Sequence, residues 1–116
     1  MQYMCLIYSQ EGSGPQPGTD EFGPFMQGYT DFTQRMKDEG KLIAGDALQP
    51  VATATTVVTR NGKTEMVDGP FAETKEQLGG YYLLECQNLD EALACAAQIP
   101  TVTYGRIEVR PLLVWD

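Results

Sequence analysis

The fold of this chain is decided by residues 67–85, which read Val67-Asp68-Gly69-Pro70-Phe71-Ala72-Glu73-Thr74-Lys75-Glu76-Gln77-Leu78-Gly79-Gly80-Tyr81-Tyr82-Leu83-Leu84-Glu85. The tripeptide Asp68-Gly69-Pro70 predicts a turn, because glycine tolerates a positive φ and proline fixes its own φ and lacks an N–H. We expect Asp68 to cap this turn through the N–H of Phe71, and the Phe71 ring to lie in the core. The role expected for Asp68 is therefore structural, and contact with a ligand is the less favoured alternative.

The second half of the same stretch predicts a helical turn followed by a strand. Thr74 and Gln77 have the spacing of a capping box, so a single helical turn should begin at Lys75. Gly79-Gly80 should stop this turn and permit close approach of the backbone. Residues 81–86 are rich in aromatic and branched apolar side chains, which is typical of a strand.

Outside this stretch, strand signals recur along the chain. Short apolar or alternating runs predict strands over residues 3–8, 42–48 and 106–112. Asn61-Gly62 is a strong hairpin turn and should join strands over residues 54–60 and 63–67.

Two segments have the pattern of amphipathic helices. From Phe22 to Met36, apolar side chains follow one another at spacings of three and four, which predicts a helix that Thr19 caps and Gly40 ends. Asn88 should cap a second helix. Its expected buried residues are Leu89, Ala92, Leu93, Ala96 and Ala97.

The order of these elements is β-α-β, a β-hairpin insertion and β-α-β. This order predicts a ferredoxin-like α+β fold, in which both helices cover one face of an antiparallel sheet. At 116 residues the chain is long enough for one core, so we expect residues 1–116 to form a single domain.

Charge and cysteine content narrow the partners and the compartment. The net charge of −8 repels phosphate backbones and anionic lipids, so we expect no nucleic-acid partner and no membrane partner. The three cysteines form no CxxC pair, which predicts buried, reduced thiols. Because no basic segment followed by an apolar run precedes the first strand, we expect a cytoplasmic protein.

Residues 68–81 resemble the signature of the YCII-related family, in its DGPF subgroup. The resemblance extends to residues 3–8, 48–50, 54–56 and 104–111, and so covers nearly the whole chain. It implies a ferredoxin-like fold that pairs into a dimeric α/β barrel. It also implies a regulatory role alongside extracytoplasmic-function sigma factors.

The chain contains no histidine, which excludes Ser-His-Asp catalysis, Cys-His catalysis and proton transfer by imidazole. The resemblance to the wider YCII family implies acid–base work by a histidine with an aspartate. Because that histidine is missing, we do not expect the same mechanism here. There is also no glycine-rich phosphate loop or dinucleotide fingerprint, and we expect neither a cofactor nor a metal.

Asp46, Tyr81 and Arg106 are the candidate ligand-binding residues. Asp46 lies in an apolar run, where burial would raise its pKa and suit it to carry a proton; the alternative is a solvated or hydrogen-bonded side chain at a strand end. Tyr81 and Tyr82 alternate faces, so one of them could direct its hydroxyl into a cleft between the sheet and the first helix while the other packs. Arg106 could bind a substrate carboxylate, or form a surface salt-bridge ladder with Glu108 and Arg110.

Two classes of function stay open. The first is a small-molecule-binding, accessory or regulatory protein. The second is a cofactor-free enzyme that performs proton transfer or elimination on a small organic acid or lactone, with Asp46 as the candidate catalytic residue. In both cases we expect a homodimer, because residues 3–8 and 81–84 are apolar on both faces of their strands and two helices can cover only one face.

Overall fold

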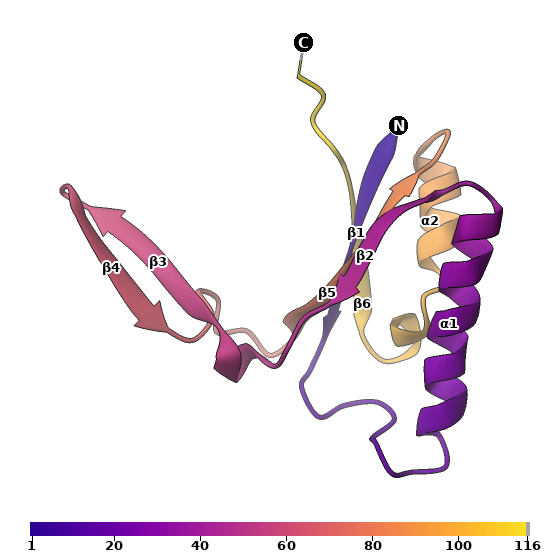
Figure 1. The fold of residues 1–116 in the computed structure, drawn as a ribbon, viewed down its shortest axis with the longest axis horizontal. Coiled ribbons are helices and arrows are strands. Elements are labelled where there is room, and N and C mark those ends of the chain that lie inside the picture. Colours follow the sequence, from indigo (N-terminus) through magenta and orange to yellow (C-terminus); the bar gives the residue numbers. More distant parts are fainter. Residues whose placement is uncertain (116) are drawn as a thin grey trace.

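The computed structural model describes residues 1–115, and its body is a four-stranded antiparallel sheet with two helices on one face (Figure 1). The sheet has the strand order β2-β5-β1-β6. Its elements are β1 (Gln2–Ser9), α1 (Phe22–Asp38), β2 (Leu42–Ala47), β5 (Gln77–Glu85), α2 (Leu89–Ala96) and β6 (Arg106–Pro111), with short 3-10 helices at Val51–Thr53 and Pro100–Thr103. This arrangement confirms the predicted ferredoxin-like α+β fold.

The core lies between the sheet and the two helices. Tyr3, Cys5 and Ile7 of β1 alternate with half-buried neighbours and point toward the helices, as do Tyr82 and Leu84 of β5. The helical layer supplies most of the other core residues, which are Phe32, Met36, Ala92, Cys95, Ala96 and Ile99. The three cysteines are buried and form no disulfide bonds with one another, as predicted.

The opposite side of the sheet, called the open face here, has no helix over it. Its central residues are apolar and half-buried, and they are Met4, Leu6 and Tyr8 of β1 with Tyr81 and Leu83 of β5. The edge strands place Asp46 on this face from β2, and Arg106, Glu108 and Arg110 from β6.

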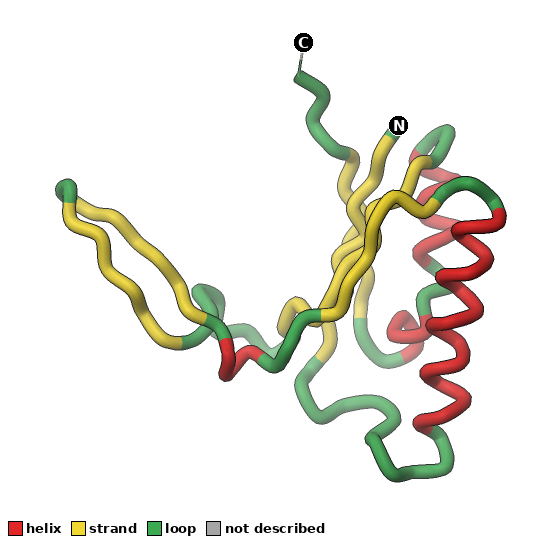
Figure 2. The backbone as a smooth tube through the Cα atoms, viewed as in Figure 1, coloured by secondary structure: helices red, strands yellow, loops and turns green. Residues whose placement is uncertain are grey.

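The remaining two strands, β3 (Thr55–Arg60) and β4 (Lys63–Asp68), form a separate hairpin. Asn61 and Gly62 both have positive φ, 53° and 75°, which confirms the predicted tight turn. The hairpin projects from the body on the side of the open face (Figure 2). The radius of gyration is therefore 16.3 Å, against about 13 Å for a compact domain of this length.

Local signals at three helix ends gave mixed outcomes. Gly40 adopts φ +72° after the last turn of α1, and Asn88 Oδ1 accepts a hydrogen bond of 2.9 Å from Glu91 N at the start of α2, as expected. The prediction that Thr19 caps α1 is wrong, because the cap position is Glu21 and the Thr19 hydroxyl donates to Gln16 O instead. The predicted buried side of the second helix is partly wrong, because Leu89 and Leu93 are about half exposed and Ala97 is exposed. Ala92 and Ala96 are buried as predicted, together with Cys95.

Two predictions for residues 71–80 are wrong. The Phe71 side chain is 88% exposed and does not enter the core. No helical turn begins at Lys75, since Gln77 uses its side chain to donate to Ala72 O and Thr74 O and is already the first residue of β5. Gly79 and Gly80 lie inside β5, but the expected close approach holds, because a Cβ at Gly80 would be 3.0 Å from Asp46 O.

The turn after β4 is held by groups other than the Asp68 carboxylate. Gly69 N donates to Ala54 O at 2.8 Å, and the Thr56 hydroxyl donates to Gly69 O at 2.8 Å. Asp68 is exposed at the end of β4. The predicted cap from Asp68 to Phe71 N is therefore replaced by contacts between the two ends of the hairpin.

Among residues 1–115, no helix is both long enough and apolar enough to cross a membrane.

Candidate functional site

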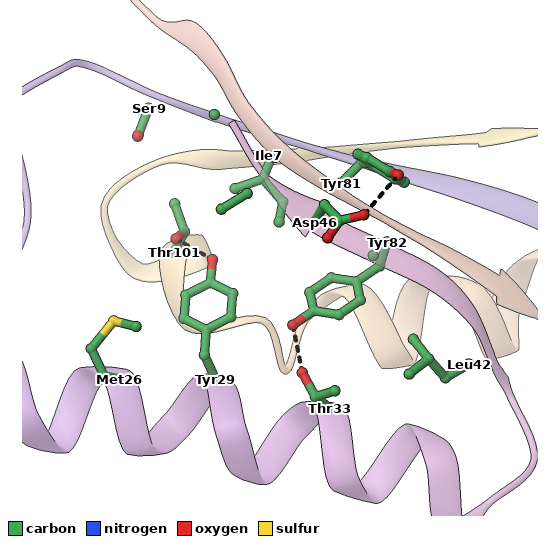
Figure 3. A pocket seen from close by; sticks show the side chains of 14 residues that line it. Ile7, Ser9, Met26, Tyr29, Thr33, Leu42, Asp46, Tyr81, Tyr82 and Thr101 are labelled. Carbon is green, nitrogen blue, oxygen red and sulfur yellow. Dashed lines mark hydrogen bonds between the residues drawn. The ribbon is translucent and has the colours of Figure 1, made fainter. Parts of the chain in front are cut away.

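A cleft of about 440 Å³ lies between α1 and the sheet, at the end where β1 finishes and β5 begins (Figure 3). We call it the α1 cleft. Tyr29 and Thr33 reach it from α1, Tyr82 and Gly45 from the helix face of the sheet, and Thr101 from the 3-10 helix Pro100–Thr103. The α1 cleft thus joins three parts of the chain that are far apart in sequence.

Two pairs of hydroxyl groups mark the wall of the α1 cleft. The Tyr29 and Thr101 hydroxyls are 2.5 Å apart, and the Thr33 and Tyr82 hydroxyls are 2.7 Å apart (Figure 3). Each hydroxyl can donate one hydrogen bond and accept others, so a pair retains acceptor capacity for a further partner. The cleft can therefore offer hydrogen bonds to a ligand without offering charge.

Aromatic packing holds these hydroxyls in place. The Tyr29 and Tyr82 rings stack with centroids 6.5 Å apart and an interplanar angle of 14°. Phe32 packs edge-on against Tyr82 at 5.0 Å, and Phe25 packs edge-on against Tyr29 at 5.5 Å. Such offset and edge-to-face pairs are favourable arrangements for aromatic rings, so they fix the ring positions along this wall.

Gly45 makes room for the Tyr82 ring. A Cβ added at Gly45 would lie 2.6 Å from Tyr82 Cδ1 and 2.9 Å from Tyr82 Cε1. Gly45 and Tyr82 are direct partners in the pairing of β2 with β5, and the Cδ1–Cε1 edge of the ring lies next to the glycine. The shape of the cleft floor therefore depends on the missing side chain at this position.

Burial raises the pKa of the Tyr29 phenol, and its hydrogen bonding with Thr101 offsets this only in part. An ordinary tyrosine is already protonated at neutral pH, so a phenol with a raised pKa is protonated there as well. Tyr29 is consequently a neutral hydrogen-bonding group and is poorly suited to act as a base.

Asp46 and Tyr81 lie together, but on the open face. The Tyr81 hydroxyl donates to Asp46 Oδ2 at 3.3 Å, and Asp46 is exposed. Both residues also border the α1 cleft, yet Gly45 and Tyr82 are the pair that faces it, so strand alternation turns the Asp46 and Tyr81 side chains away. Asp46 therefore lacks the burial that would suit it to carry a proton. The alternative prediction, a solvated or hydrogen-bonded side chain at a strand end, describes Asp46 better.

A bulge in β2 explains this placement of Asp46. Leu42 pairs with Leu84 and Ala44 pairs with Leu83, so Ile43 is an extra residue in β2. An extra residue reverses which face the following side chains occupy. Without it, Asp46 would share the helix face with Leu42.

Arg106 lies apart from Asp46 and Tyr81. It starts β6 at the far edge of the sheet, and its Nε is 3.3 Å from Glu76 Oε1. A second, open hollow of about 670 Å³ surrounds this ion pair. Arg110 pairs with Glu108, as the ladder interpretation predicted. One copy of the chain therefore does not bring the three predicted ligand-binding residues into one site.

Sequence reasoning missed three of the four hydroxyl-bearing residues named here on the wall of the α1 cleft. Tyr29 and Thr33 lie within the predicted amphipathic helix of residues 22–36, and the sequence pattern assigned no role to Thr101. The signal available was their chemistry, because Tyr29 and Thr33 are polar members of an otherwise apolar stripe and are one helical turn apart.

The signature in residues 68–81 predicts a family, and comparison with known protein families tests that prediction. The model of the YCII-related domain matches residues 1–116. The chain belongs to the YCII-related family. It is also similar to the uncharacterized protein R00369 of Rhizobium meliloti (strain 1021), with 37% identity over 117 residues that cover 99% of this chain and 94% of that relative. Assignment to the DGPF subgroup of the YCII-related family stays a prediction.

Proposed function

We propose that this YCII-related protein binds a small, uncharged, largely apolar molecule in the α1 cleft, and that the molecule carries a hydroxyl or carbonyl group. The observation that carries this proposal is the pair of hydroxyl contacts, Tyr29 with Thr101 and Thr33 with Tyr82, in an aromatic wall. A volume of about 440 Å³ is in the range of small-molecule sites, which are mostly apolar with a few placed polar groups.

The preference for an uncharged ligand follows from the side chains that face the cleft. Tyr29, Thr33, Tyr82 and Thr101 are neutral, and the carboxylate of Asp46 is on the other face of the sheet. A charged group moved from water to such a wall would lose hydration without gaining a counter-charge. A hydroxyl or carbonyl group would lose less and could join an existing hydroxyl pair.

The same wall favours a binding or accessory role over an acid–base enzyme. An efficient general acid or base needs a pKa near the working pH. Burial moves the pKa of Tyr29 away from that range, and Asp46 does not face the cleft. We therefore place a binding protein, including one that regulates a partner, ahead of an enzyme acting on an organic acid or lactone.

Ligand-detected NMR with paired probes tests this proposal. One member of each pair is a neutral aromatic alcohol, and the other is the aromatic acid of the same size. We expect the alcohol to bind and the acid to bind at least several-fold more weakly. Chemical shifts of the labelled protein should change at Tyr29 and Thr33. Tighter binding of the acids would contradict the proposal.

A matched pair of threonine variants gives the control. Thr33→Val removes one cleft hydroxyl, and Thr30→Val makes the same change on α1 at an exposed residue whose hydroxyl bonds Met26 O. Loss of one hydrogen bond is worth about 1 kcal/mol, so Thr33→Val should weaken the alcohol about fivefold. Thr30→Val should leave its affinity unchanged, and equal effects of the two variants would sink the assignment.

A further inference from the structure

The loop between β1 and α1, residues 10–19, is held together by its own hydrogen bonds. Gln16 Nε2 donates to the three carbonyl oxygens of residues 12–14 at 2.9–3.2 Å, and the Thr19 hydroxyl donates to Gln16 O at 2.7 Å. Figure 2 shows this loop crossing from the sheet to α1 at the end of the molecule where the α1 cleft lies. A loop that packs on itself can move as one body when its contacts to the rest of the fold are weak.

This loop contacts distant parts of the fold through Glu11 and Gly14. The Glu11 carboxylate accepts an exposed hydrogen bond of 3.2 Å from Val51 N, and water competes for both groups. The backbone of Gly14 lies against the end of the Tyr104 ring, where an added Cβ would be 2.3 Å from Cζ. We call this contact of Gly14 with Tyr104 the latch. It depends on the missing side chain of Gly14, since any larger residue would meet the ring.

Aromatic rings join the latch to the wall of the α1 cleft. Tyr104 packs on Phe25 with ring centroids 5.9 Å apart, and Phe25 packs edge-on against Tyr29 at 5.5 Å. Tyr104 N also donates to Thr101 O at 3.1 Å, and the Thr101 hydroxyl is the partner of the Tyr29 hydroxyl in the cleft. The ring that contacts the loop is therefore packed into the same group of residues that forms the cleft wall.

The α1 cleft continues toward the loop. A hollow of about 240 Å³ lies beside residues 11–12. Ser9 and Gly79 line both this hollow and the α1 cleft, so the two spaces meet at the start of the loop. The loop is therefore not packed solidly on the body at this point, and it has room to move.

We propose that the loop of residues 10–19 is a gate for the α1 cleft and that Tyr104 is the positioning residue that holds the gate closed. Gly12 and Gly18 lie on either side of the latch with φ of +79° and +87°, and they can serve as hinges because glycine tolerates changes of φ and ψ. Release of the latch lets the loop swing away and widens the entrance at Ser9. The inference rests on the proposed function, since the gate controls access of that ligand to the same cleft.

A thiol at the entrance tests the gate without any ligand. Ser9→Cys places the thiol where the cleft meets the hollow, and its rate of reaction with dithionitrobenzoate follows the population of the open gate. The native cysteines are buried, and burial raises the pKa of Cys5 and Cys86 to about 11, so their thiols react slowly. Their rate in a chain that keeps Ser9 reports opening of the core.

Two glycine variants separate the latch from backbone strain. Gly14→Ala and Gly18→Ala both place alanine at a positive φ, but only the Cβ at position 14 meets the Tyr104 ring, and nothing lies within 4 Å of the one at position 18. We expect Gly14→Ala to speed the reaction of the Ser9→Cys thiol at least about fivefold more than Gly18→Ala does, because the clash destabilises the closed loop. Equal acceleration by the two variants, or faster reaction of the native thiols as well, would overturn the gate.

Variants of Tyr104 test its role in the latch. Tyr104→Phe keeps the ring atoms that Gly14 meets, and Tyr104→Leu removes them. We expect Tyr104→Leu to speed the reaction as Gly14→Ala does and Tyr104→Phe to leave its rate unchanged. Gly14→Ala should add little in the Tyr104→Leu background, because the two changes break the same contact. Independent, additive effects would show that the ring does not hold the loop.

The kinetics of the aromatic alcohol give a second measurement. Release of a gate speeds both entry and exit, so Gly14→Ala should raise the association and dissociation rates by similar factors and change the affinity less. Faster dissociation without faster association would overturn the gate. Supporting thiol rates with an alcohol that does not bind would leave the gate standing and refute the proposed function. Binding of the alcohol with equal thiol rates in the two glycine variants would do the reverse.

Discussion

Replacing Gly45 by alanine tests whether the α1 cleft is built as described. The new Cβ would lie 2.6 Å from Tyr82 Cδ1, a distance that real Cβ contacts essentially never show, so the ring must move. The ring has little freedom to do so, because Phe32 packs on its edge and its hydroxyl bonds Thr33 at 2.7 Å. We therefore expect Gly45→Ala to destabilise the fold and to distort the cleft.

The expected magnitude comes from two contributions. Forcing one extra carbon into a packed site costs about 1–3 kcal/mol. If the ring swings far enough to lose the Thr33 hydroxyl, about 1 kcal/mol is lost as well. Urea unfolding at one fixed protein concentration should therefore show a loss of about 2–4 kcal/mol. The affinity of an aromatic alcohol for the cleft should fall in the same variant.

Two further variants make this test specific. Gly23→Ala in α1 adds a methyl group where nothing lies within 4 Å, so it should be neutral or slightly stabilising. Tyr82→Val removes the Cδ1 and Cε1 atoms that the new Cβ meets, so Gly45→Ala should cost much less in that background. The reasoning would be refuted if Gly45→Ala changed the stability of the wild type by less than about 0.5 kcal/mol, or cost the same in both backgrounds.

Three further predictions concern stability. Asn88→Ala removes the acceptor for Glu91 N and should cost about 1 kcal/mol in urea unfolding, while a loss near zero would mean that α2 does not need this cap. At the base of the hairpin, Thr56→Val should cost about 1 kcal/mol and Asp68→Ala less than about 0.5 kcal/mol; the reverse order would restore Asp68 as the cap. Burial raises the pKa of Cys5 from 9.0 to about 11, so the unfolded state loses this proton first and stability should fall as pH rises from 9 to 11. Cys5→Ala should make that fall shallower in unfolding curves measured across this range, and an unchanged slope would argue against the shift.

The sequence by itself determined the features that depend on neighbours along the chain. The positive φ values of Asn61 and Gly62, the end of α1 at Gly40 and the cap at Asn88 each involve groups within about four residues. The continuous apolar run of β1, the alternation of charged and apolar side chains in β6 and the helical spacing in α1 are likewise local patterns. Together with the order of elements they were enough to predict the ferredoxin-like fold.

Local patterns gave a wrong prediction where the same residues could form either a helical turn or a strand. Thr74 and Gln77 have the spacing of a capping box, but Gln77 joins β5, and its side chain bonds the carbonyls of Ala72 and Thr74. Pairing along β1 satisfies the backbone of this segment better than one isolated helical turn could, because a single turn forms few hydrogen bonds for the residues it orders. Phe71 sits in the connection before β5 and stays exposed.

Only the tertiary structure decided which residues form the candidate site. Thr101 meets Tyr29 across 72 positions of sequence, and Tyr82 meets Thr33 across 49. The extra residue Ile43 sends Asp46 to the open face, whereas plain alternation from Leu42 would have sent it to the cleft. Strand register and bulges are set by contacts between distant segments, and one residue of shift reverses the face of every side chain that follows. The helices and strands could therefore be read from the sequence, but the face on which each polar side chain lies could not.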